Sequence, residues 1–386
     1  MNSTPDALIG RGVDCIDTPA AVIDLDAMER NIARMAGFAR KHGMRWRPHA
    51  KLHKSAAIAL LLTQAGACGH CVQKLSEAEA LAAGGVRDLF ISNEVIAPHK
   101  LLRVARLAAD LAARGGRLGI AVDSPEGITR LARAMDAAGS DAGIDVFVEI
   151  DVGQGRCGAA PGPEAVALAL AVAARPRLHF AGLHAYQGRA QHLRTVAERR
   201  AAIAHAAQAA SATRALIEAA GLAVPLVTGA GTGTLAHEAT SGVYGELQAG
   251  SFLFMDADYA ANERDEAQPA FEQALFIKTQ VISVRAHHAV CDAGHKSHAI
   301  DSGLPLPHGL PPDRALRYAN GGDEHGILHP ASPGAPLPAL GQTLWLIPGH
   351  CDPTVNLHDQ LIGVRGGLEH GVVERVIRVD ARGAVT

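Results

Sequence analysis

The chain has 386 residues, of which 48% are hydrophobic and 19% charged, and its formal net charge is −3. This length suits a barrel of roughly 250 residues together with a smaller second domain. The small net charge and the 4% of aromatic residues argue against a nucleic acid or an anionic membrane as a partner. No uncharged apolar run approaches the ~18 residues of a membrane span, and residues 1–17 lack the apolar core of a secretory signal.

Six cysteines are spread thinly along the chain, which predicts a reduced, cytoplasmic protein without a disulfide framework. Two of them, Cys68 and Cys71, have the CxxC spacing of metal and redox sites. No second pair follows to complete a zinc site. We therefore favour the interpretation that they are small buried residues of a strand.

The first two thirds of the chain alternate short β-rich runs with alanine-rich helical stretches. Helices are expected over 76–83 and 197–220, for example, and Gly221 is placed to end the second one. Eight alternations predict a parallel (β/α)8 TIM barrel over residues 26–258. An open doubly wound sheet would need a glycine-rich turn after the first strand, which Arg-Pro-His-Ala-Lys lacks. The expected strands are 45–49, 69–73, 88–92, 118–122, 145–150, 180–185, 225–228 and 246–249.

After residue 258 the pattern of predicted elements changes, because strand-like runs follow one another without long helices. Proline and glycine cluster from 302 to 341. This pattern predicts a mostly antiparallel β domain with one long excursion. A further strand near 18–25 could join it, so residues 1–25 and 259–386 are assigned to this domain. Its other expected strands are 276–284, 288–292, 343–347, 361–364 and 371–379.

Polar residues follow nearly every predicted barrel strand, at the end where such barrels carry their chemistry. The turns Gly231-Thr232 and Gly250-Ser251 come after strands seven and eight, where these barrels usually bind phosphate through backbone N–H groups and hydroxyls. Ordinary glycine turns are the alternative. The remaining candidates at the strand ends are Lys51, Gln73, Arg156, Tyr186, His192 and Thr228.

A phosphate site opposite a lysine at a barrel mouth suits pyridoxal phosphate, with Lys51 as the Schiff-base lysine. Arg156 could bond to the cofactor's phenolate or to the substrate carboxylate, and Tyr186 could face the cofactor ring. An ordinary surface lysine is the alternative for Lys51.

In the second domain, His350 and Asp352 stand two residues apart. On an extended strand both would point the same way and could bind one ion. An imidazole and a carboxylate suit a divalent metal such as Mn²⁺ or Mg²⁺, while a hydrogen-bonded His/Asp pair is the alternative. Asp301 could reach the substrate side chain. The cluster Asp323-Glu324-His325 is interpreted as a solvated loop.

Taken together, these segments resemble the metal-activated D-threonine aldolase and 3-hydroxy-D-aspartate aldolase group of the alanine-racemase-like, fold type III pyridoxal phosphate enzymes. The resemblance runs over almost the whole chain. It rests on Arg-Pro-His-Ala-Lys at 47–51, Gln-Lys-Leu-Ser-Glu-Ala-Glu at 73–79, Ile-Ser-Asn-Glu-Val at 91–95, Val-Glu-Ile-Asp-Val-Gly-Gln-Gly-Arg-Cys-Gly at 148–158, Leu-Gln-Ala-Gly-Ser at 247–251, Phe-Met-Asp-Ala-Asp-Tyr at 254–259 and Pro-Gly-His-Cys-Asp-Pro-Thr at 348–354.

The resemblance implies that Lys51 binds the cofactor, that His350 and Asp352 hold the metal, and that His192 lies near the substrate's β-hydroxyl. It implies a carbon–carbon lyase that cleaves a D-3-hydroxy amino acid, such as D-threonine, D-allo-threonine or 3-hydroxy-D-aspartate, to glycine and an aldehyde. It also implies a head-to-tail homodimer with its active sites at the subunit junction. At 229–233 the chain reads Gly-Ala-Gly-Thr-Gly, where the group often has three glycines in a row.

Other activities stay open beside the aldolase. In the sister branch of D-serine and D-3-hydroxyaspartate dehydratases, which release ammonia, a zinc-binding cysteine stands two residues after the metal histidine. Here that position is Asp352, which favours the aldolase. A racemase is a further alternative. A non-catalytic cofactor-binding barrel is another, but the additional β domain argues against it.

Overall fold

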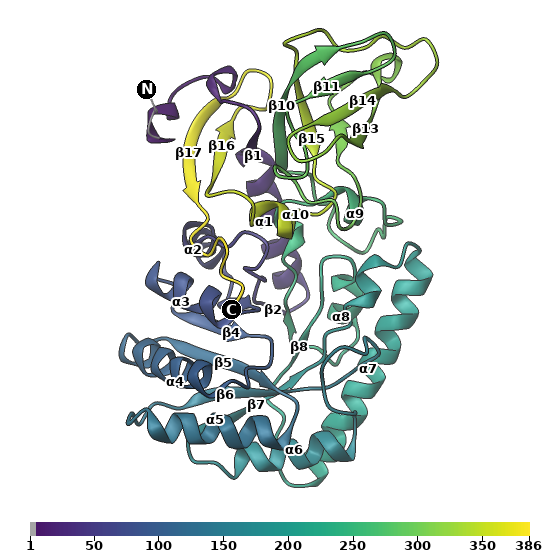
Figure 1. The fold of residues 1–386 in the computed structure, drawn as a ribbon. Helices are drawn as coiled ribbons and strands as arrows, with labels where there is room; N and C mark the ends of the chain where they lie inside the picture. Colours follow the sequence, from purple (N-terminus) through teal and green to yellow (C-terminus); the bar gives the residue numbers. More distant parts are fainter. Residues whose placement is uncertain (1–4) are drawn as a thin grey trace.

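Eight parallel strands curl into the predicted barrel in a computed structural model that describes residues 5–386 (Figure 1). Residues 1–4, part of the predicted β domain, lie outside the described residues. The strand order around the sheet is β2-β9-β8-β7-β6-β5-β4-β3. The strands are β2 (Arg45–Trp46), β3 (His70–Val72), β4 (Asp88–Ile91), β5 (Arg117–Val122), β6 (Ile144–Glu149), β7 (Leu178–His184), β8 (Val227–Gly229) and β9 (Glu246–Leu247).

The sheet closes between its first strand and β3 through one parallel bridge, from His49 to Cys71. The predicted strand over 45–49 is too long, since β2 ends at Trp46. Pro48 has no N–H to donate to a strand ladder, although its backbone oxygen accepts from Cys71 N at 3.0 Å. All six cysteines are free. Cys71 is fully buried in β3, as the structural interpretation of the CxxC spacing predicts, whereas Cys68 lies before this strand and is only partly buried.

Helices cover the outside of the barrel, and three of those named below begin at a residue whose side chain caps the first turn. Thr195 and Glu198 form a reciprocal capping box at the start of α7, as Thr-x-x-Glu predicts. Gly221 follows α7 with a φ of +86°, the left-handed conformation that ends helices. The helices are α1 (Leu25–Lys41), α2 (Ala56–Gln64), α3 (Leu75–Ala83), α4 (Pro98–Ala113), α5 (Pro125–Ala137), α6 (Pro163–Ala173), α7 (Val196–Ala219) and α8 (Leu235–Thr240).

The second sheet has nine strands and is mostly antiparallel, as predicted. The strand expected near 18–25 is β1, which pairs antiparallel with β10 and parallel with β16. The predicted excursion over 302–341 contains three short strands between glycines and prolines. The first pairs with the strand over 343–347, and the other two pair with each other. The strands are β1 (Ala20–Asp24), β10 (Leu275–Val284), β11 (Ala289–Cys291), β12 (Leu306–His308), β13 (Leu316–Asn320), β14 (Gly326–Pro330), β15 (Thr343–Ile347), β16 (Gln360–Arg365) and β17 (Val372–Arg378).

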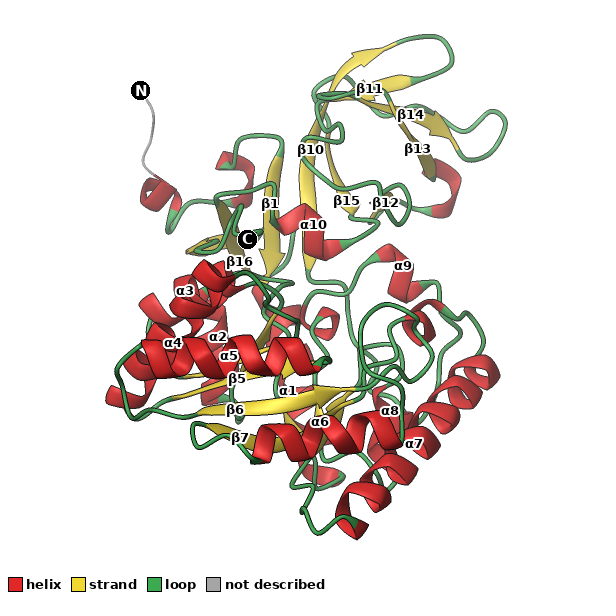
Figure 2. Ribbon diagram, turned by 60° about the horizontal axis from the view of Figure 1, so that its bottom comes forward, coloured by secondary structure: helices red, strands yellow, loops and turns green. Residues whose placement is uncertain are grey.

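Two short helices, α9 (Ala257–Ala260) and α10 (Cys351–Val355), lie between the barrel and the second sheet (Figure 2). The Asp256 carboxylate accepts from Tyr259 N (3.0 Å) within the first turn of α9 and from Cys351 N (3.1 Å) at the start of α10. One carboxylate therefore fastens the end of the barrel chain to the segment that carries His350 and Asp352.

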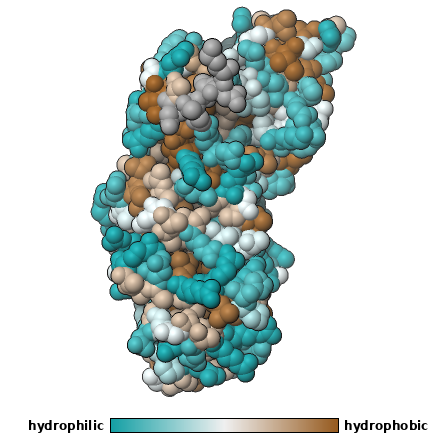
Figure 3. Space-filling view, turned by 60° about the vertical axis from the view of Figure 1, so that its left-hand side comes forward, coloured by the Kyte–Doolittle hydropathy of each residue, from teal (hydrophilic) through white to brown (hydrophobic). Residues whose placement is uncertain are grey.

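The chain's last residue returns to the barrel (Figure 1). There Ser76 Oγ donates to the Thr386 backbone oxygen at 2.6 Å. Among the helices within residues 5–386, none combines the length and the apolarity needed to cross a membrane. On the face turned forward in Figure 3, hydrophilic side chains are spread over both sheets' regions, with hydrophobic ones in separate groups between them.

Candidate active site

A cavity of about 200 Å³ opens at the C-terminal ends of the barrel strands and faces α10. Residues from seven separate strand ends meet here, at the edge where such barrels carry their chemistry. Most of the predicted site residues line this cavity: Lys51, Gln73, Arg156, Tyr186, His192, Gly231, Thr232, Gly250, Ser251 and Asp352.

Lys51 and Asp352 are direct partners across this cavity. Lys51 Nζ lies 2.5 Å from Asp352 Oδ2, although the two residues are 301 positions apart in the chain. Burial works against a charged lysine, but the carboxylate beside it raises the pKa of Lys51 above its ordinary value. Burial would likewise raise the pKa of Asp352, yet Lys51 and His350 together hold it below its ordinary value. The pair is therefore ionic.

Thr228 is the predicted cofactor residue that the structure does not bring into the cavity. Its hydroxyl donates to Glu246 Oε1 at 2.9 Å and accepts from Gln248 Nε2 at 2.8 Å. Glu246 also pairs with Arg47 at 3.1 Å, so this hydroxyl belongs to a polar network beneath the cavity. The single proton that this hydroxyl can donate is already used there.

The predicted extended geometry of His350 and Asp352 is wrong, since α10 begins at Cys351 and includes Asp352. His350 is the extended residue just before this helix. Its backbone oxygen accepts from Thr354 Oγ1 at 2.6 Å, and Asp256 satisfies the N–H of Cys351. These contacts replace the ones a strand would make and turn the chain into a helix.

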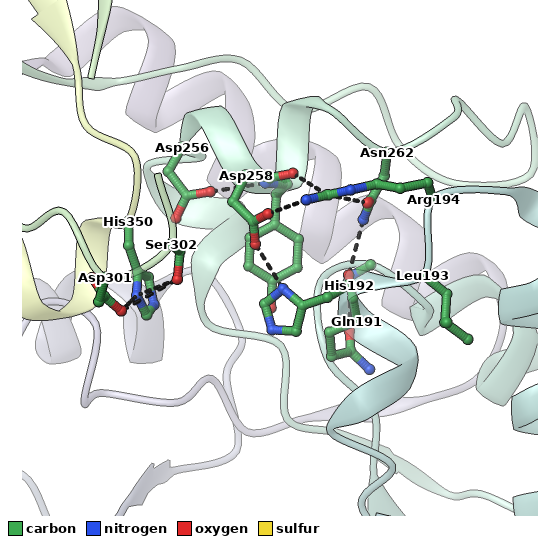
Figure 4. Close-up of polar contacts among 12 residues, drawn as sticks. Gln191, His192, Leu193, Arg194, Asp256, Asp258, Asn262, Asp301, Ser302 and His350 are labelled. Carbon is green, nitrogen blue, oxygen red and sulfur yellow. Dashed lines mark hydrogen bonds and ion pairs between the residues drawn. The ribbon is translucent and has the colours of Figure 1, made fainter. Parts of the chain in front are cut away.

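His350 has a carboxylate partner of its own. Its Nδ1 lies 2.7 Å from Asp301 Oδ2 and 3.3 Å from Ser302 Oγ (Figure 4). A carboxylate that receives the Nδ1 proton leaves Nε2 as the coordinating nitrogen. Asp301 thus orients the imidazole of His350. The Asp323 and Glu324 carboxylates instead pair with Lys296 at 3.2 and 2.7 Å in an exposed loop outside the cavity.

His192 lies at the end of a short 3-10 helix (Arg189–His192) and its side chain is 51% exposed. Its Nδ1 stands 2.6 Å from Asp258 Oδ2 on α9 (Figure 4). The Tyr259 ring, which also lines the cavity, packs with its centroid 5.9 Å from the imidazole. Asp258 and Tyr259 were not among the predicted site residues. Their signal in the sequence was the segment Phe-Met-Asp-Ala-Asp-Tyr.

A buried histidine, His184, forms part of the cavity wall without having been predicted as a site residue. Its Nδ1 lies 3.0 Å from Glu149 Oε2 and its Nε2 lies 3.2 Å from Gln248 Oε1. Burial would lower the pKa of His184, but the adjacent Glu149 carboxylate raises it. The position at the end of the sixth predicted strand was the available signal.

Arg156 and Tyr186 form a second pair on the wall of the cavity. The guanidinium carbon of Arg156 lies 5.9 Å from the Tyr186 ring centroid, within the range of a cation–π contact. Arg156 Nη2 also stands 3.9 Å from Glu149 Oε1. Gln73 is held by its backbone, whose N–H donates to Glu77 Oε2 at 2.8 Å. These contacts orient Arg156, Tyr186 and Gln73 on the wall of the cavity.

Comparison with known proteins identifies family models for both parts of the chain. The family model described as alanine racemase, N-terminal domain, matches residues 23–258, and the model described as putative serine dehydratase domain matches residues 274–364. Fold and site thus define an alanine-racemase-like barrel with a dehydratase-type second domain.

Full-length relatives narrow the class. The chain is 44% identical to D-threonine aldolase of Arthrobacter sp. over 98% of this chain and 96% of that protein. It is also 44% identical to 3-hydroxy-D-aspartate aldolase of Paracoccus denitrificans (strain Pd 1222), over 98% of this chain and 95% of that protein. A crystal structure of D-threonine aldolase from Filomicrobium marinum matches with a TM-score of 0.92 and 45% identity, over 98% of this chain and 99% of that chain.

The chain therefore belongs to the alanine-racemase-like family, in the group that contains D-threonine aldolase and 3-hydroxy-D-aspartate aldolase. The resemblance and the fold expected from the sequence are confirmed. Membership implies pyridoxal phosphate, and the cavity fits it. Lys51 offers the amine. A Cβ on Gly250 would stand 2.8 Å from the His49 backbone oxygen, so only a glycine lets these two strand ends form the cavity wall.

The residues for a divalent metal also fit such an ion. Asp352 Oδ1 is buried and has no hydrogen-bond partner among residues 5–386. The unused carboxylate oxygen and the imidazole of His350 make the mixed donor set that the sequence predicted. An unpaired buried carboxylate oxygen is costly, and a bound cation would remove that cost.

Proposed function

We propose that this protein is a pyridoxal phosphate- and metal-dependent aldolase that cleaves a D-3-hydroxy amino acid to glycine and an aldehyde. The observation that carries the proposal is the convergence of Lys51, His192 and Asp352 on one cavity. D-threonine and 3-hydroxy-D-aspartate are the substrate candidates, because the relatives named for them are equally similar to this chain.

Different residues of the chain would have different roles in this reaction. Lys51 would hold the cofactor, with Gly231, Thr232, Gly250 and Ser251 along the cavity wall. When bound, the cofactor supplies an electron sink for the pair released from the Cα–Cβ bond. His192 is the exposed base on the cavity wall, suited to accept the proton of the β-hydroxyl.

His350 and Asp352 would hold the metal, and their donor set favours Mn²⁺ or Mg²⁺. The ion would polarise the β-hydroxyl and lower its pKa. The imidazole of His350 is oriented independently of the substrate, by its contact with Asp301. Activation by a divalent metal is therefore part of the proposal.

A dehydratase is the second candidate, and the match of residues 274–364 to a putative serine dehydratase domain favours it. A metal-binding cysteine is what that alternative would require two residues after His350. The chain has Asp352 there, and the adjacent Cys351 is fully buried with its Sγ 3.2 Å from Met255 O. The aldolase remains the better supported function.

We also propose that the protein is a homodimer acting in the cytoplasm, with a partner subunit covering the candidate site. Large apolar side chains stand exposed beside Asp301 and Ser302: Leu306 is 52% exposed, and Ile300 and Leu304 are exposed as well. Exposed apolar groups at the rim of a polar site are typical of a protein interface. The six free cysteines suit a reducing compartment.

The test is product analysis of the purified protein with D-threonine and with 3-hydroxy-D-aspartate, each with Mn²⁺ and with a chelator. Glycine and an aldehyde that disappear on chelation are the expected result. Lys51→Ala should abolish cleavage, while Lys41→Ala at the exposed end of α1 serves as the control. Ammonia and a keto acid as products would instead assign the protein to the dehydratases.

A further inference from the structure

Asp258 makes two charge-assisted contacts from a nearly buried position. Its side chain is 7% exposed, and its Oδ2 lies 2.6 Å from His192 Nδ1. The other carboxylate oxygen, Oδ1, accepts from the Arg194 guanidinium, which also donates to the Asp258 backbone oxygen at 2.7 Å (Figure 4). Both carboxylate oxygens therefore have fixed partners, and neither can rotate away without breaking an ion pair.

The carboxylate stays ionised in this environment. Burial would raise the pKa of Asp258, but the hydrogen bonds from Arg194 and His192 lower it below its ordinary value. An ionised carboxylate can only accept hydrogen bonds. The proton of a neutral His192 ring must therefore be on Nδ1, and Nε2 is left as the acceptor.

The segment that carries Asp258 is tied to the segment that carries the proposed metal ligands. Ala257 N donates to Pro348 O at 3.0 Å and Asp258 N donates to Gly349 O at 3.3 Å. Asp256 completes the link through Cys351 N. These contacts fix the position of Asp258, and through it the imidazole of His192, relative to His350 and Asp352. His192 itself comes from a different part of the barrel mouth.

We propose that Asp258 is a positioning residue that fixes His192 with Nε2 ready to accept the proton of the substrate's β-hydroxyl. The O–H bond of the substrate breaks and an N–H bond forms at Nε2, and the positive charge that results on the ring is balanced by Asp258. This inference rests on the proposed function, because the β-hydroxyl belongs to the proposed substrate. It identifies a residue that acts through His192 and does not touch the substrate.

Asp258→Asn in the cofactor- and metal-loaded enzyme tests the inference. Arg194 would hold the amide oxygen, so the amide N–H would face His192 and force its proton onto Nε2. A wrong histidine tautomer of this kind costs as much as ~10⁴-fold in hydrolases with a Ser-His-Asp triad. We expect kcat to fall at least about 100-fold with KM changed less than about threefold, whereas Asp258→Glu should recover part of the loss.

A double-mutant cycle separates positioning from a merely structural role. In a His192→Gln background, Asp258→Asn should change the residual rate less than about threefold, since the group on which Asp258 acts is gone. An equal loss in both backgrounds would overturn the inference. Asp136→Asn, at an exposed carboxylate on α5, is the matched control and should leave kcat and KM unchanged.

A second readout does not depend on the reaction. Nitrogen-15 NMR of the histidine rings, recorded where neutral imidazoles prevail, should show His192 protonated on Nδ1, with the signal identified by its loss in His192→Gln. Asp258→Asn should move the proton to Nε2. A wild-type ring protonated on Nε2 would refute the inference even if cleavage is confirmed. Absence of cleavage in the wild type would refute the proposed function, and the NMR result would still decide the inference.

Discussion

Lys51 Nζ lies 2.5 Å from Asp352 Oδ2, so the residues proposed to hold the cofactor and the metal are each other's partner in this structure. The ammonium group and a metal ion would compete for the same carboxylate, because both are cations. A lysine bonded to the cofactor no longer presents the free ammonium group that pairs with Asp352. Binding of the proposed cofactor and binding of the proposed metal would therefore be linked through one ion pair.

This link predicts that loading with pyridoxal phosphate tightens the binding of Mn²⁺. We expect the dissociation constant to fall by about tenfold, a coupling of roughly 1.4 kcal/mol. Titration calorimetry of the cofactor-free and the loaded protein measures it. Cofactor-free Lys51→Ala should bind Mn²⁺ about as tightly as the loaded wild type, and equal affinities of the two wild-type forms would argue against the competition.

Replacing the carboxylate of Asp352 should distinguish the role of the metal from that of pyridoxal phosphate. Asp352→Asn keeps the volume of the side chain but removes the charged metal ligand, so we expect cofactor absorbance to persist while cleavage falls by about 10²-fold or more. The residual rate should no longer respond to a chelator. Asp359→Asn, at an 82% exposed carboxylate just beyond α10, is the control and should behave like the wild type. A chelator-sensitive Asp352→Asn enzyme would place the metal elsewhere.

The barrel could be predicted because its signals are local. Strand and helix alternation, the capping box at Thr195 and the glycine at 221 act within a few residues. Lys51 and the glycine turns followed from the rule that barrel chemistry lies at the strand ends. The three short strands over 302–341 were missed, since brief runs between glycines and prolines carry little periodicity.

The parts of the site that could not be predicted depend on contacts between distant residues. The helix at α10 is stabilised by Asp256, 95 positions from Cys351, so the local pattern alone favoured an extended strand. The carboxylate partners of the two candidate histidines come from 66 positions away for His192 and 49 positions away for His350. A spacing rule cannot find such pairs before the fold brings the loops together.

Gly250 offers a steric test of the cavity wall. An added Cβ would stand 2.8 Å from the His49 backbone oxygen, so Gly250→Ala must push apart the strand ends that carry Lys51 and Ser251. We expect the cofactor to bind at least about tenfold more weakly, a loss near 1.4 kcal/mol, in a spectroscopic titration of the cofactor-free protein. Gly37→Ala in α1 meets no atom within 4 Å and is the matched control. It should keep the cofactor affinity and stabilise the helix slightly. Equal cofactor affinity in the two variants would show that the wall can yield at Gly250.

Glu238 predicts a pH dependence of stability that lies outside the chemistry of the site. This carboxyl is 1% exposed, accepts from Thr234 Oγ1 at 2.8 Å through one oxygen and has no partner for the other among residues 5–386. Burial raises its pKa from 4.5 to about 7. Between these values the folded protein keeps a proton that the unfolded chain has lost, so the free energy of unfolding decreases as the pH rises from about 4.5 to about 7.

Glu238→Gln should abolish this decrease in the free energy of unfolding, because the amide stays neutral at every pH. Relative to the wild type, the variant should gain stability as the pH rises, on the order of 1–3 kcal/mol above pH 7 and close to nothing near pH 4. Urea unfolding of the two proteins at several pH values measures the difference. Glu218→Gln on the exposed face of α7 controls for removing a surface carboxylate. A stability difference between Glu238→Gln and the wild type that stays constant with pH would show that folding leaves the pKa of Glu238 unchanged.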